Sequence, residues 1–204
     1  MRLLVIGGSG QLGSALLRQV PGAVGTSRAH GLDLRDLSGL SALLDAVRPD
    51  VVVNAAYVPS GPDLEAVTAE APGRLAAACR DLRFVHVSSD VVFPGDPVAV
   101  DEHAPCRPTT VYGAAKLRAE DAVLAAHPGA LVVRTSVLWG HPGGGGAERQ
   151  VATPGFTFYD DEIRCPTHVD DLAGALLAWA GTSHAGPLHL VGADVMDRAT
   201  FARL

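Results

Sequence analysis

MRLLVIGGSGQLGSALLRQV, residues 1–20, passes from an apolar run at 3–6 into a glycine turn and then into apolar residues at helical spacing. A helix that begins directly after a strand leaves N–H groups unpaired in its first turn, and these donors attract anions. Glycines let the backbone turn sharply and approach a pyrophosphate. We therefore expect Gly7, Gly10 and Gly13 to form a dinucleotide-binding turn, with Gly13 allowing close packing of helix on sheet. The alternative is a plain strand-to-helix turn of an α/β protein.

The composition is that of a globular chain, with 48% hydrophobic and 19% charged residues among 204. The net charge of −6 and the lack of a basic block argue against a nucleic-acid partner. No apolar run has the length of a membrane helix, and the first apolar run is too short for a signal peptide. The three cysteines, at 79, 106 and 165, lack metal or redox spacing, so we expect reduced thiols in a cytoplasmic protein.

Strand and helix patterns alternate along the whole chain, which predicts an α/β fold with a doubly wound parallel sheet of the Rossmann type. Strands are expected near 2–6, 23–27, 50–54, 83–87, 130–136 and 187–191. Helices are expected at 11–20, 37–48, 63–80, 111–126 and 169–180. Ligands of such sheets bind at the carboxyl ends of the strands, so the residues that follow each strand are the candidates for a site.

Tyr112 and the chain's only lysine, Lys116, are four residues apart on a predicted helix and share one face. A free tyrosine has a pKa of about 10, and a cation beside it favours the phenolate and lowers that pKa. The pair is therefore a candidate proton donor. Incidental spacing on a surface helix is the alternative, but the other cations of this chain are all arginine.

A second group of polar residues, Ser88, Ser89 and Asp90, leaves a predicted buried strand. A hydroxyl at this place can donate a hydrogen bond to a substrate carbonyl oxygen while a tyrosine gives it a proton. Taken alone, these residues are typical of a simple turn.

Taken together, these motifs resemble those of the extended short-chain dehydrogenases/reductases, nearest the dTDP-4-dehydrorhamnose reductase (sugar nucleotide-binding) group. The matching segments are GGSGQLG (7–13), LDLRD (32–36), RPDVVVNAA (48–56), VHVSSDVVFPGD (85–96), PTTVYGAAKLRAED (108–121), VVRTSVLWG (132–140), RCPTHVDDLA (164–173) and GPLHLVG (186–192). They occur in the family's order along nearly the whole chain.

The resemblance implies both the cofactor contacts and the catalytic residues. Its implied cofactor contacts are Gly7, Gly10, Gln11, Leu12, Gly13, Asp33, Leu34, Asn54, Ala55, Ala56, Tyr112 and Lys116. Its catalytic Ser/Thr–Tyr–Lys triad falls on Ser89, Tyr112 and Lys116, with Ser88 as a neighbour that assists. No metal is implied.

The cofactor is expected to be NADP(H), with NAD(H) as the alternative. The second predicted strand ends in Thr26, Ser27 and Arg28. NAD sites usually carry an acidic residue there, whereas an arginine accommodates the 2′-phosphate of NADP. A plain surface charge is the alternative reading of Arg28.

The chain departs from the family pattern in several places. Val91 stands where the family has a tyrosine, and Thr68 where it has an asparagine. The glycine-rich segment 141–155 shows no helical period and is expected to be a loose loop. We therefore expect one NAD(P)-binding Rossmann domain over 1–204, with a shortened substrate lobe around 138–168 and 192–204.

The leading hypothesis is an NADP-dependent reductase of a nucleotide-linked 4-keto sugar. A non-catalytic NADP-binding regulatory subunit, and a sugar epimerase or dehydratase on the same fold, are the alternatives. The expected partner is a small nucleotide sugar, without nucleic acid or membrane, and a homodimer is left open. The acidic residues at 160–162 are expected to form a solvated turn, with a contact to a metal or a partner chain as the alternative.

Overall fold

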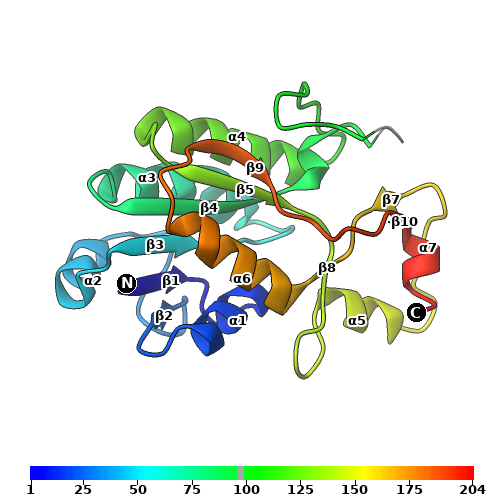
Figure 1. The fold of residues 1–204 in the computed structure, drawn as a ribbon, viewed down its shortest axis with the longest axis horizontal. Helices are drawn as coiled ribbons and strands as arrows, with labels where there is room; N and C mark the ends of the chain where they lie inside the picture. The colour runs from blue at the N-terminus through cyan, green and yellow to red at the C-terminus, as the bar shows by residue number, and fades with distance from the viewer. Residues whose placement is uncertain (96–98) are drawn as a thin grey trace.

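Six parallel strands form the central sheet in the computed structural model, which describes residues 1–95 and 99–204 (Figure 1). The strands are β1 (Leu3–Ile6), β2 (Val24–Thr26), β3 (Val51–Asn54), β4 (Arg83–Ser89), β5 (Leu131–Thr135) and β9 (Gly186–His189). Their order is β2-β1-β3-β4-β5-β9, so the chain winds outward in both directions from β1 and β3. This confirms the predicted doubly wound sheet and places its switch point, where ligands bind, between β1 and β3.

Helices cover both faces of the sheet. One face carries α1 (Gln11–Gln19) and α6 (Val169–Ala180). The other carries α2 (Leu40–Val47), the π-helical turn η1 (Glu65–Glu70) with α3 (Ala71–Ala78), and α4 (Val111–Ala126). Alternate residues of β1 point to the two layers, since Val5 packs with the α1 and α6 side and Leu4 with the α2, α3 and α4 side.

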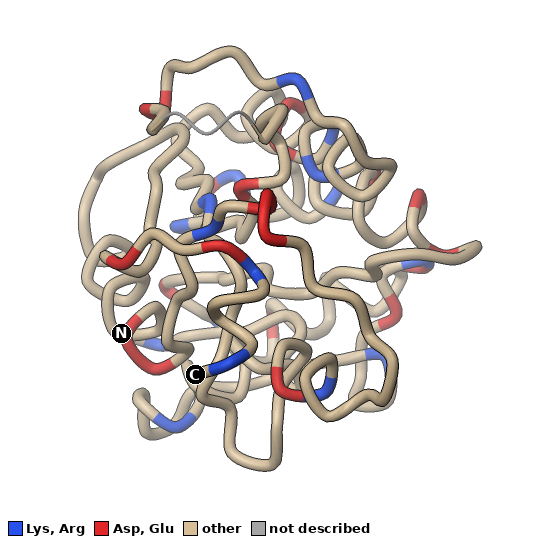
Figure 2. The backbone as a smooth tube through the Cα atoms, turned by 90° about the vertical axis from the view of Figure 1, so that its right-hand side faces the viewer, with Lys and Arg blue, Asp and Glu red and all other residues tan. Residues whose placement is uncertain are grey.

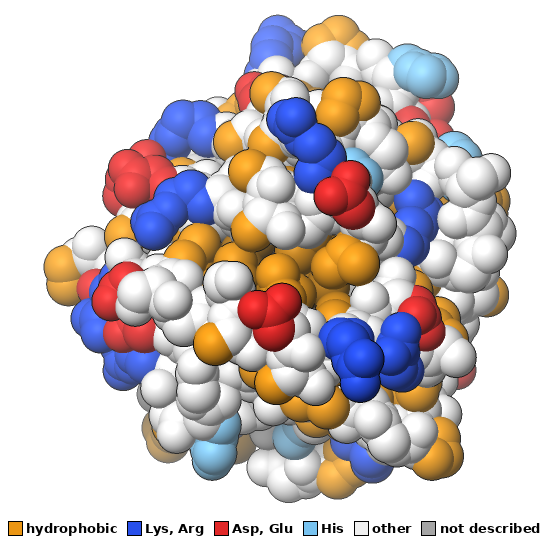
Figure 3. All heavy atoms as spheres, turned by 90° about the vertical axis from the view of Figure 1, so that its left-hand side faces the viewer, with side chains coloured by type: hydrophobic (Ala, Val, Ile, Leu, Met, Phe, Trp, Pro, Cys, Tyr) orange, Lys and Arg blue, Asp and Glu red, His pale blue; other side chains and the backbone are white. Residues whose placement is uncertain are grey.

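The smaller elements lie beyond the carboxyl ends of the strands, on the side that Figure 2 faces. They are η2 (Asp90–Val92), β6 (Leu138–Trp139), α5 (Gly146–Val151), β7 (Ile163–Arg164), β8 (Thr167–His168), β10 (Met196–Asp197) and α7 (Arg198–Phe201). β6 pairs with β8 in parallel and β7 with β10 antiparallel. Basic and acidic residues are interspersed on this side and on the opposite side, where Figure 3 also shows exposed apolar side chains between them.

The predicted strands and helices are all present, with small differences at their ends. The segment predicted as one helix over 63–80 is split into η1 and α3. Pro72 lies just after this change and lacks the N–H that a continuous α-helix would use. Asp96, the last residue of one predicted motif, lies outside the described residues.

The prediction of a structureless loop over 141–155 is wrong for residues 146–151, which form α5. Glu148 explains the helix, because its carboxylate accepts hydrogen bonds from the N–H groups of Gly140 at 2.6 Å and Gly145 at 2.8 Å. His141 Nε2 also lies 3.1 Å from Ser14 Oγ. These contacts tie the glycine run to the start of α1.

A buried ion pair joins α4 to β5. Arg134 donates to both carboxylate oxygens of Glu120, the shortest contact being 2.7 Å, and the two side chains are 6% and 3% exposed. Arg134 also donates to the carbonyl oxygen of Glu102 at 3.2 Å, and its guanidinium carbon lies 5.1 Å from the centre of the Phe93 ring. The pair fixes α4, the helix with Tyr112 and Lys116, against the sheet.

Candidate active site

The glycine turn has the close packing that the sequence predicts. Gly7 has φ +87°, and a Cβ added there would lie 2.7 Å from the backbone nitrogen of Ala56. A Cβ on Gly13 would lie 2.1 Å from the carbonyl oxygen of Gly7. Side chains at these two positions would therefore push β3 or α1 away from the turn. Gly10 lines both cavities at this edge of the sheet.

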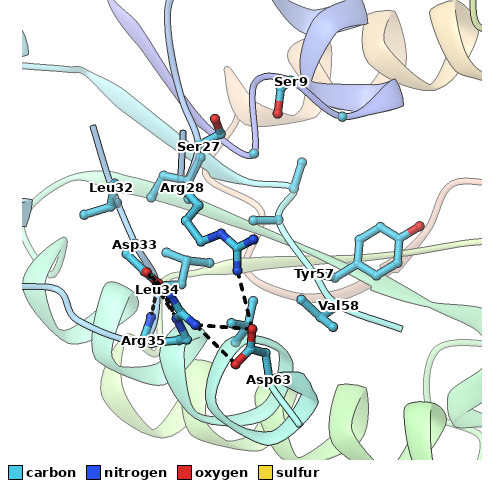
Figure 4. Close-up of a pocket in the computed structure, with 16 residues that line it drawn as sticks. Ser9, Ser27, Arg28, Leu32, Asp33, Leu34, Arg35, Tyr57, Val58 and Asp63 are labelled. Atoms are coloured by element: carbon cyan, nitrogen blue, oxygen red, sulfur yellow. Dashed lines mark hydrogen bonds and ion pairs between the residues drawn. The ribbon is translucent and has the colours of Figure 1, made fainter. Parts of the chain in front are cut away.

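The first cavity, of about 300 Å³, lies at the ends of β1, β2 and β3 (Figure 4). Seven of the predicted cofactor residues line it: Gly7, Gly10, Arg28, Asp33, Leu34, Ala55 and Ala56. Apolar side chains of Leu32, Leu34 and Val67 supply a surface for a flat ring, and Arg28 supplies a cation. The arrangement fits the adenosine half of a dinucleotide.

Two residues that the sequence reasoning missed, Arg35 and Asp63, complete the charges of this cavity. Arg35 donates to both carboxylate oxygens of Asp33, and these hydrogen bonds lower the pKa of Asp33 to about 2. Asp63 lies between two cations, 3.5 Å from Arg28 Nη1 and 3.4 Å from Arg35 Nη1 (Figure 4). Asp63 thus pairs with two guanidinium groups that could otherwise bind an incoming anion.

The second cavity, of about 700 Å³, brings the predicted triad and the glycine turn together. The predicted residues that line it are Gly10, Gln11, Leu12, Ala55, Ser88, Ser89, Tyr112 and Lys116. Since Gly10 and Ala55 belong to both cavities, an extended molecule can reach from the first into the second. Of the predicted residues, Asn54 and Gly13 line neither cavity.

Asn54 instead holds the turn after β3 through a hydrogen bond. Its Oδ1 accepts a hydrogen bond from Ala56 N at 3.2 Å, and its Nδ2 lies 3.2 Å from His86 Nδ1. Burial, and the charge of Lys116, hold the pKa of His86 well below its usual range, so this ring is neutral. Thr68, in the place of the expected asparagine, holds the same segment through hydrogen bonds with Val58 N and O, both 2.8 Å.

Tyr112 and Lys116 lie in the first two turns of α4. Thr110 caps this helix, because its Oγ1 accepts a hydrogen bond from Gly113 N at 2.9 Å. The ammonium of Lys116 lies 5.9 Å from the centre of the Tyr112 ring and 5.4 Å from that of Tyr57. It donates to the carbonyl oxygen of Val87 at 3.0 Å. Its side chain is buried, and burial lowers the pKa of Lys116 to about 8.

The pKa of Tyr112 differs from the sequence expectation. Burial raises it well above its usual value, and Tyr57 and Asp90 add to this effect, whereas the cation of Arg164 opposes it. Desolvation of the phenolate therefore outweighs the nearby positive charge. The phenol keeps its proton at neutral pH, which suits a group that must give a proton away.

The hydroxyl groups at the end of β4, on Ser88 and Ser89, line the second cavity. Ser89 Oγ donates to Asp90 Oδ1 at 3.2 Å and accepts from Val91 N at 3.4 Å. Within the described part of the chain, no partner is present for four buried polar atoms that belong to residues lining the second cavity: Gln11 Nε2, Ser88 Oγ, Thr135 Oγ1 and Arg198 Nη1. Buried polar groups are nearly always paired, so these atoms fit a polar cofactor or substrate.

The outer wall of the second cavity comes from residues that the sequence reasoning did not assign. They are Arg149, Gln150, Phe156, Phe158, Tyr159, Glu162, Arg164 and Arg198. Glu162, in the segment expected to be a solvated turn, keeps 40% of its side chain exposed and also accepts a hydrogen bond from Arg164 Nε at 3.1 Å. Pairing of β7 with β10 turns this residue toward the cavity, a long-range contact that no local pattern encodes.

The chain is similar to a known protein family and to several named proteins. The family described as RmlD substrate binding domain matches residues 1–204. The dTDP-4-dehydrorhamnose reductase of Mycobacterium tuberculosis is 36% identical over 99% of this chain and 73% of its own length. The dTDP-4-keto-6-deoxy-D-glucose reductase of Streptomyces niveus is 34% identical over 100% of this chain and 77% of its own length.

A solved structure is similar over almost the whole chain. The dTDP-4-dehydrorhamnose reductase of Bacillus anthracis, crystallised in complex with NADP, superposes with a TM-score of 0.87 and 25% identity. The match covers 99% of this chain and 78% of that one. Among residues 1–95 and 99–204, no group of three His, Cys, Asp or Glu side chains could hold a metal ion, and no helix there is long and apolar enough to cross a membrane.

Proposed function

This chain belongs to the RmlD substrate binding domain family, and we propose that Ser89, Tyr112 and Lys116 carry its chemistry. The protein is an NAD(P)-dependent oxidoreductase of the extended short-chain dehydrogenase/reductase type. It reduces a nucleotide-linked 4-keto sugar and uses NADP(H) in preference to NAD(H).

The two cavities fit the cofactor. Arg28, Asp33 and Leu34 would hold the adenosine half, and Gly10 to Leu12 would hold the pyrophosphate at the start of α1. Lys116 would reach the ribose beside the nicotinamide, since its ammonium is buried in the second cavity. When bound, NADPH supplies the hydride that reduces the carbonyl carbon.

Tyr112 gives the carbonyl oxygen its proton as that oxygen gains charge. Its raised pKa keeps the phenol protonated until the oxygen becomes basic enough to take the proton. Ser89 donates a hydrogen bond to the same oxygen, turning its hydroxyl from Asp90 to the substrate. Lys116 holds the ribose and stabilises the phenolate that is left, because its charge lies beside the Tyr112 ring.

One observation carries the assignment: Ser89, Tyr112 and Lys116, from two separate elements, line the same cavity as the glycine turn. The test is NADPH oxidation with dTDP-4-dehydrorhamnose or a related 4-keto nucleotide sugar, followed at 340 nm. Turnover that requires Tyr112 supports the proposal. Tight NADPH binding without turnover on any such sugar would favour the regulatory-subunit alternative instead.

The organisation of the substrate side is also a proposal. We take 1–204 as one Rossmann domain in which 138–168 and 192–204 form a short substrate lobe, since β6 to β8, α5, β10 and α7 gather there. The free thiols of Cys79, Cys106 and Cys165 suit a cytoplasmic location. That location and a homodimer stay predictions.

A further inference from the structure

Tyr57 lies in the segment after β3, at the place where the two cavities meet. It lines both of them, and 51% of the residue is exposed. In Figure 4 its ring stands apart from the charged cluster of Arg28, Arg35 and Asp63, and its hydroxyl points away from that cluster. The contacts that Tyr57 makes are therefore with the second cavity, and they indicate a role there.

The ammonium of Lys116 forms a triangle with two aromatic rings. It lies 5.4 Å from the centre of the Tyr57 ring and 5.9 Å from that of Tyr112. The two ring centres are 5.8 Å apart, and their planes are inclined by 52°. Both distances to the ammonium are within the range of about 6 Å over which the face of an aromatic ring attracts a cation.

This attraction matters because the ammonium of Lys116 is buried. The residue is 3% exposed, and its Nζ donates a hydrogen bond to the carbonyl oxygen of Val87 at 3.0 Å. Burial of a charged amine favours its neutral form. Glu120, one turn further along α4, acts against this effect, but its carboxylate is held by Arg134.

The other titratable groups on the elements around Lys116 are neutral or already paired. They are the neutral His86 of β4 and the protonated Tyr112 of α4, and the pairs of Glu65 in η1 with Arg118 and of Asp90 in η2 with Arg164. The two rings and the Val87 carbonyl oxygen therefore do most to stabilise the charge on this lysine. Of the two rings, that of Tyr112 belongs to the proposed acid, whereas Tyr57 has no such task.

We propose that Tyr57 is a positioning residue, whose ring keeps the ammonium of Lys116 charged and in place beside Tyr112. The inference rests on the proposed function, in which Lys116 holds the ribose and stabilises the phenolate. An aromatic face beside a desolvated cation changes the balance between its charged and neutral forms about tenfold. Burial already lowers the pKa of Lys116 to about 8, so loss of the ring should lower this pKa further, into the neutral range.

The titration of Lys116 can be observed directly, because it is the only lysine of the chain. In full-length protein labelled with ¹³C at the lysine Cε, NMR shows one side-chain signal, and its change with pH gives the pKa of Lys116 without any cofactor. We expect a midpoint near pH 8 in the wild type. The midpoint should lie about one pH unit lower in Tyr57→Leu, which has no ring. Tyr57→Met serves in its place if the leucine variant does not fold.

Two control variants separate the ring from other causes. Tyr57→Phe keeps the ring and loses only the hydroxyl, so its midpoint should stay within about 0.3 pH unit of the wild type. Trp139→Leu removes another exposed aromatic residue that lines neither cavity, and it should leave the midpoint unchanged. An unchanged midpoint in Tyr57→Leu overturns the inference. A shift of equal size in either control would assign the effect to the hydroxyl or to a general loosening, and would also overturn it.

NADPH titration of the same variants distinguishes this inference from the proposed function. If Lys116 holds the ribose, Tyr57→Leu should bind NADPH about two- to threefold more weakly than the wild type at pH 7.5, with a smaller difference at pH 6, where both lysines are charged. A lowered lysine midpoint without any change in NADPH binding upholds the role of Tyr57 and counts against Lys116 as the ribose ligand. A loss of NADPH affinity with an unchanged lysine midpoint would make Tyr57 a contact of the cofactor only, and would overturn the inference.

Discussion

The ammonium of Lys116 lies 5.9 Å from the centre of the Tyr112 ring while it donates to the carbonyl oxygen of Val87 in β4. The lysine is thus tied to the sheet, and burial sets the pKa of Tyr112 more strongly than the neighbouring charge does. An acid whose pKa is raised gives up its proton only to a strongly basic oxygen. This arrangement favours reduction, in which such an oxygen develops.

Tyr112→Phe should abolish reduction and leave cofactor binding nearly unchanged. Phenylalanine keeps the ring that packs 5.8 Å from Tyr57 but lacks the proton donor. Loss of general acid catalysis lowers rates about 10²- to 10⁴-fold. The measurement is kcat for NADPH oxidation beside a separate NADPH affinity. A variant that stays within threefold of the wild-type rate would show that Tyr112 is not the acid.

NADPH affinity should fall as the pH rises through about 8, the pKa to which burial lowers Lys116. Below this pH the ammonium is charged and donates strongly to the ribose; above it the neutral amine binds less well. We expect a loss of about tenfold between pH 7 and pH 9.5, the difference between a charged and a neutral donor. Fluorescence titration at each pH measures it.

Lys116→Arg is the control for this pH dependence, because its guanidinium stays charged throughout the range. Its affinity should be lower at every pH but without the fall near pH 8. The pKa values of Tyr112, Cys106 and Cys165 are all raised, mainly by burial, which moves their titration further above pH 8. The same fall in Lys116→Arg would assign it to another group.

Arg28→Ala should lower the affinity for NADPH about tenfold and leave that for NADH nearly unchanged. Arg28 lies beside the first cavity, where it can bind the 2′-phosphate that NADH lacks. The measurement is the pair of dissociation constants for each cofactor. An equal loss of affinity for both cofactors would mean that Arg28 does not bind the 2′-phosphate.

Asp63→Asn should have the opposite effect, a gain in NADPH affinity. Asp63 lies 3.5 Å from Arg28 and 3.4 Å from Arg35, and a 2′-phosphate must compete with it for both. The amide keeps the size of the side chain and removes the competing charge. The gain should be largest at low ionic strength, where exposed charges are least screened. No gain at any salt concentration would contradict this role.

The fold was largely predictable because strand and helix patterns are local. Four apolar residues in β1 run into a glycine turn and then α1, and each feature can be read from neighbouring residues. The short helix α5 was missed because its stability comes from Glu148 accepting N–H groups of Gly140 and Gly145, not from apolar periodicity. The glycine content of this segment, taken alone, predicts a loop and not a helix.

The sequence predicted the part of the site that lies at the ends of the central strands, but not its outer wall. Residues at the ends of β1, β3 and β4 were found because parallel strands end at one edge of the sheet. Arg164 and Arg198 were not found, since they reach the cavity through β7 pairing with β10, which the local sequence does not encode. Arg35 and Asp63 were missed for a similar reason: Asp63 meets Arg28 and Arg35 only in the folded chain.

Glu120→Ala should destabilise the protein strongly, because it leaves Arg134 charged, buried and without its main acceptor. Removing one partner of a buried pair typically costs about 3–5 kcal/mol, which corresponds to a fall in Tm of roughly 10 °C for a chain of this length. Calorimetry measures Tm. Asp50→Asn, which breaks the exposed Arg2–Asp50 pair, should change Tm little. Equally small changes in Tm in both variants would show that the buried Arg134–Glu120 pair does not stabilise the protein.

Glu148→Ala should speed hydrogen exchange across α5. In the wild type we expect fast exchange at 142–144 and slower exchange at 146–151, where the helix is hydrogen-bonded. Burial acts to raise the pKa of Glu148, but the backbone N–H groups that donate to its carboxylate lower this pKa overall. Acid should therefore loosen the segment as the pH falls through the lowered pKa. Removing the carboxylate should raise exchange at 146–151 about tenfold, the effect of losing a helix cap. Glu65→Ala, which breaks an exposed pair with Arg118, should leave α5 unchanged. Exchange as fast in the wild type as in the variant would mean that Glu148 does not anchor this part of the substrate lobe.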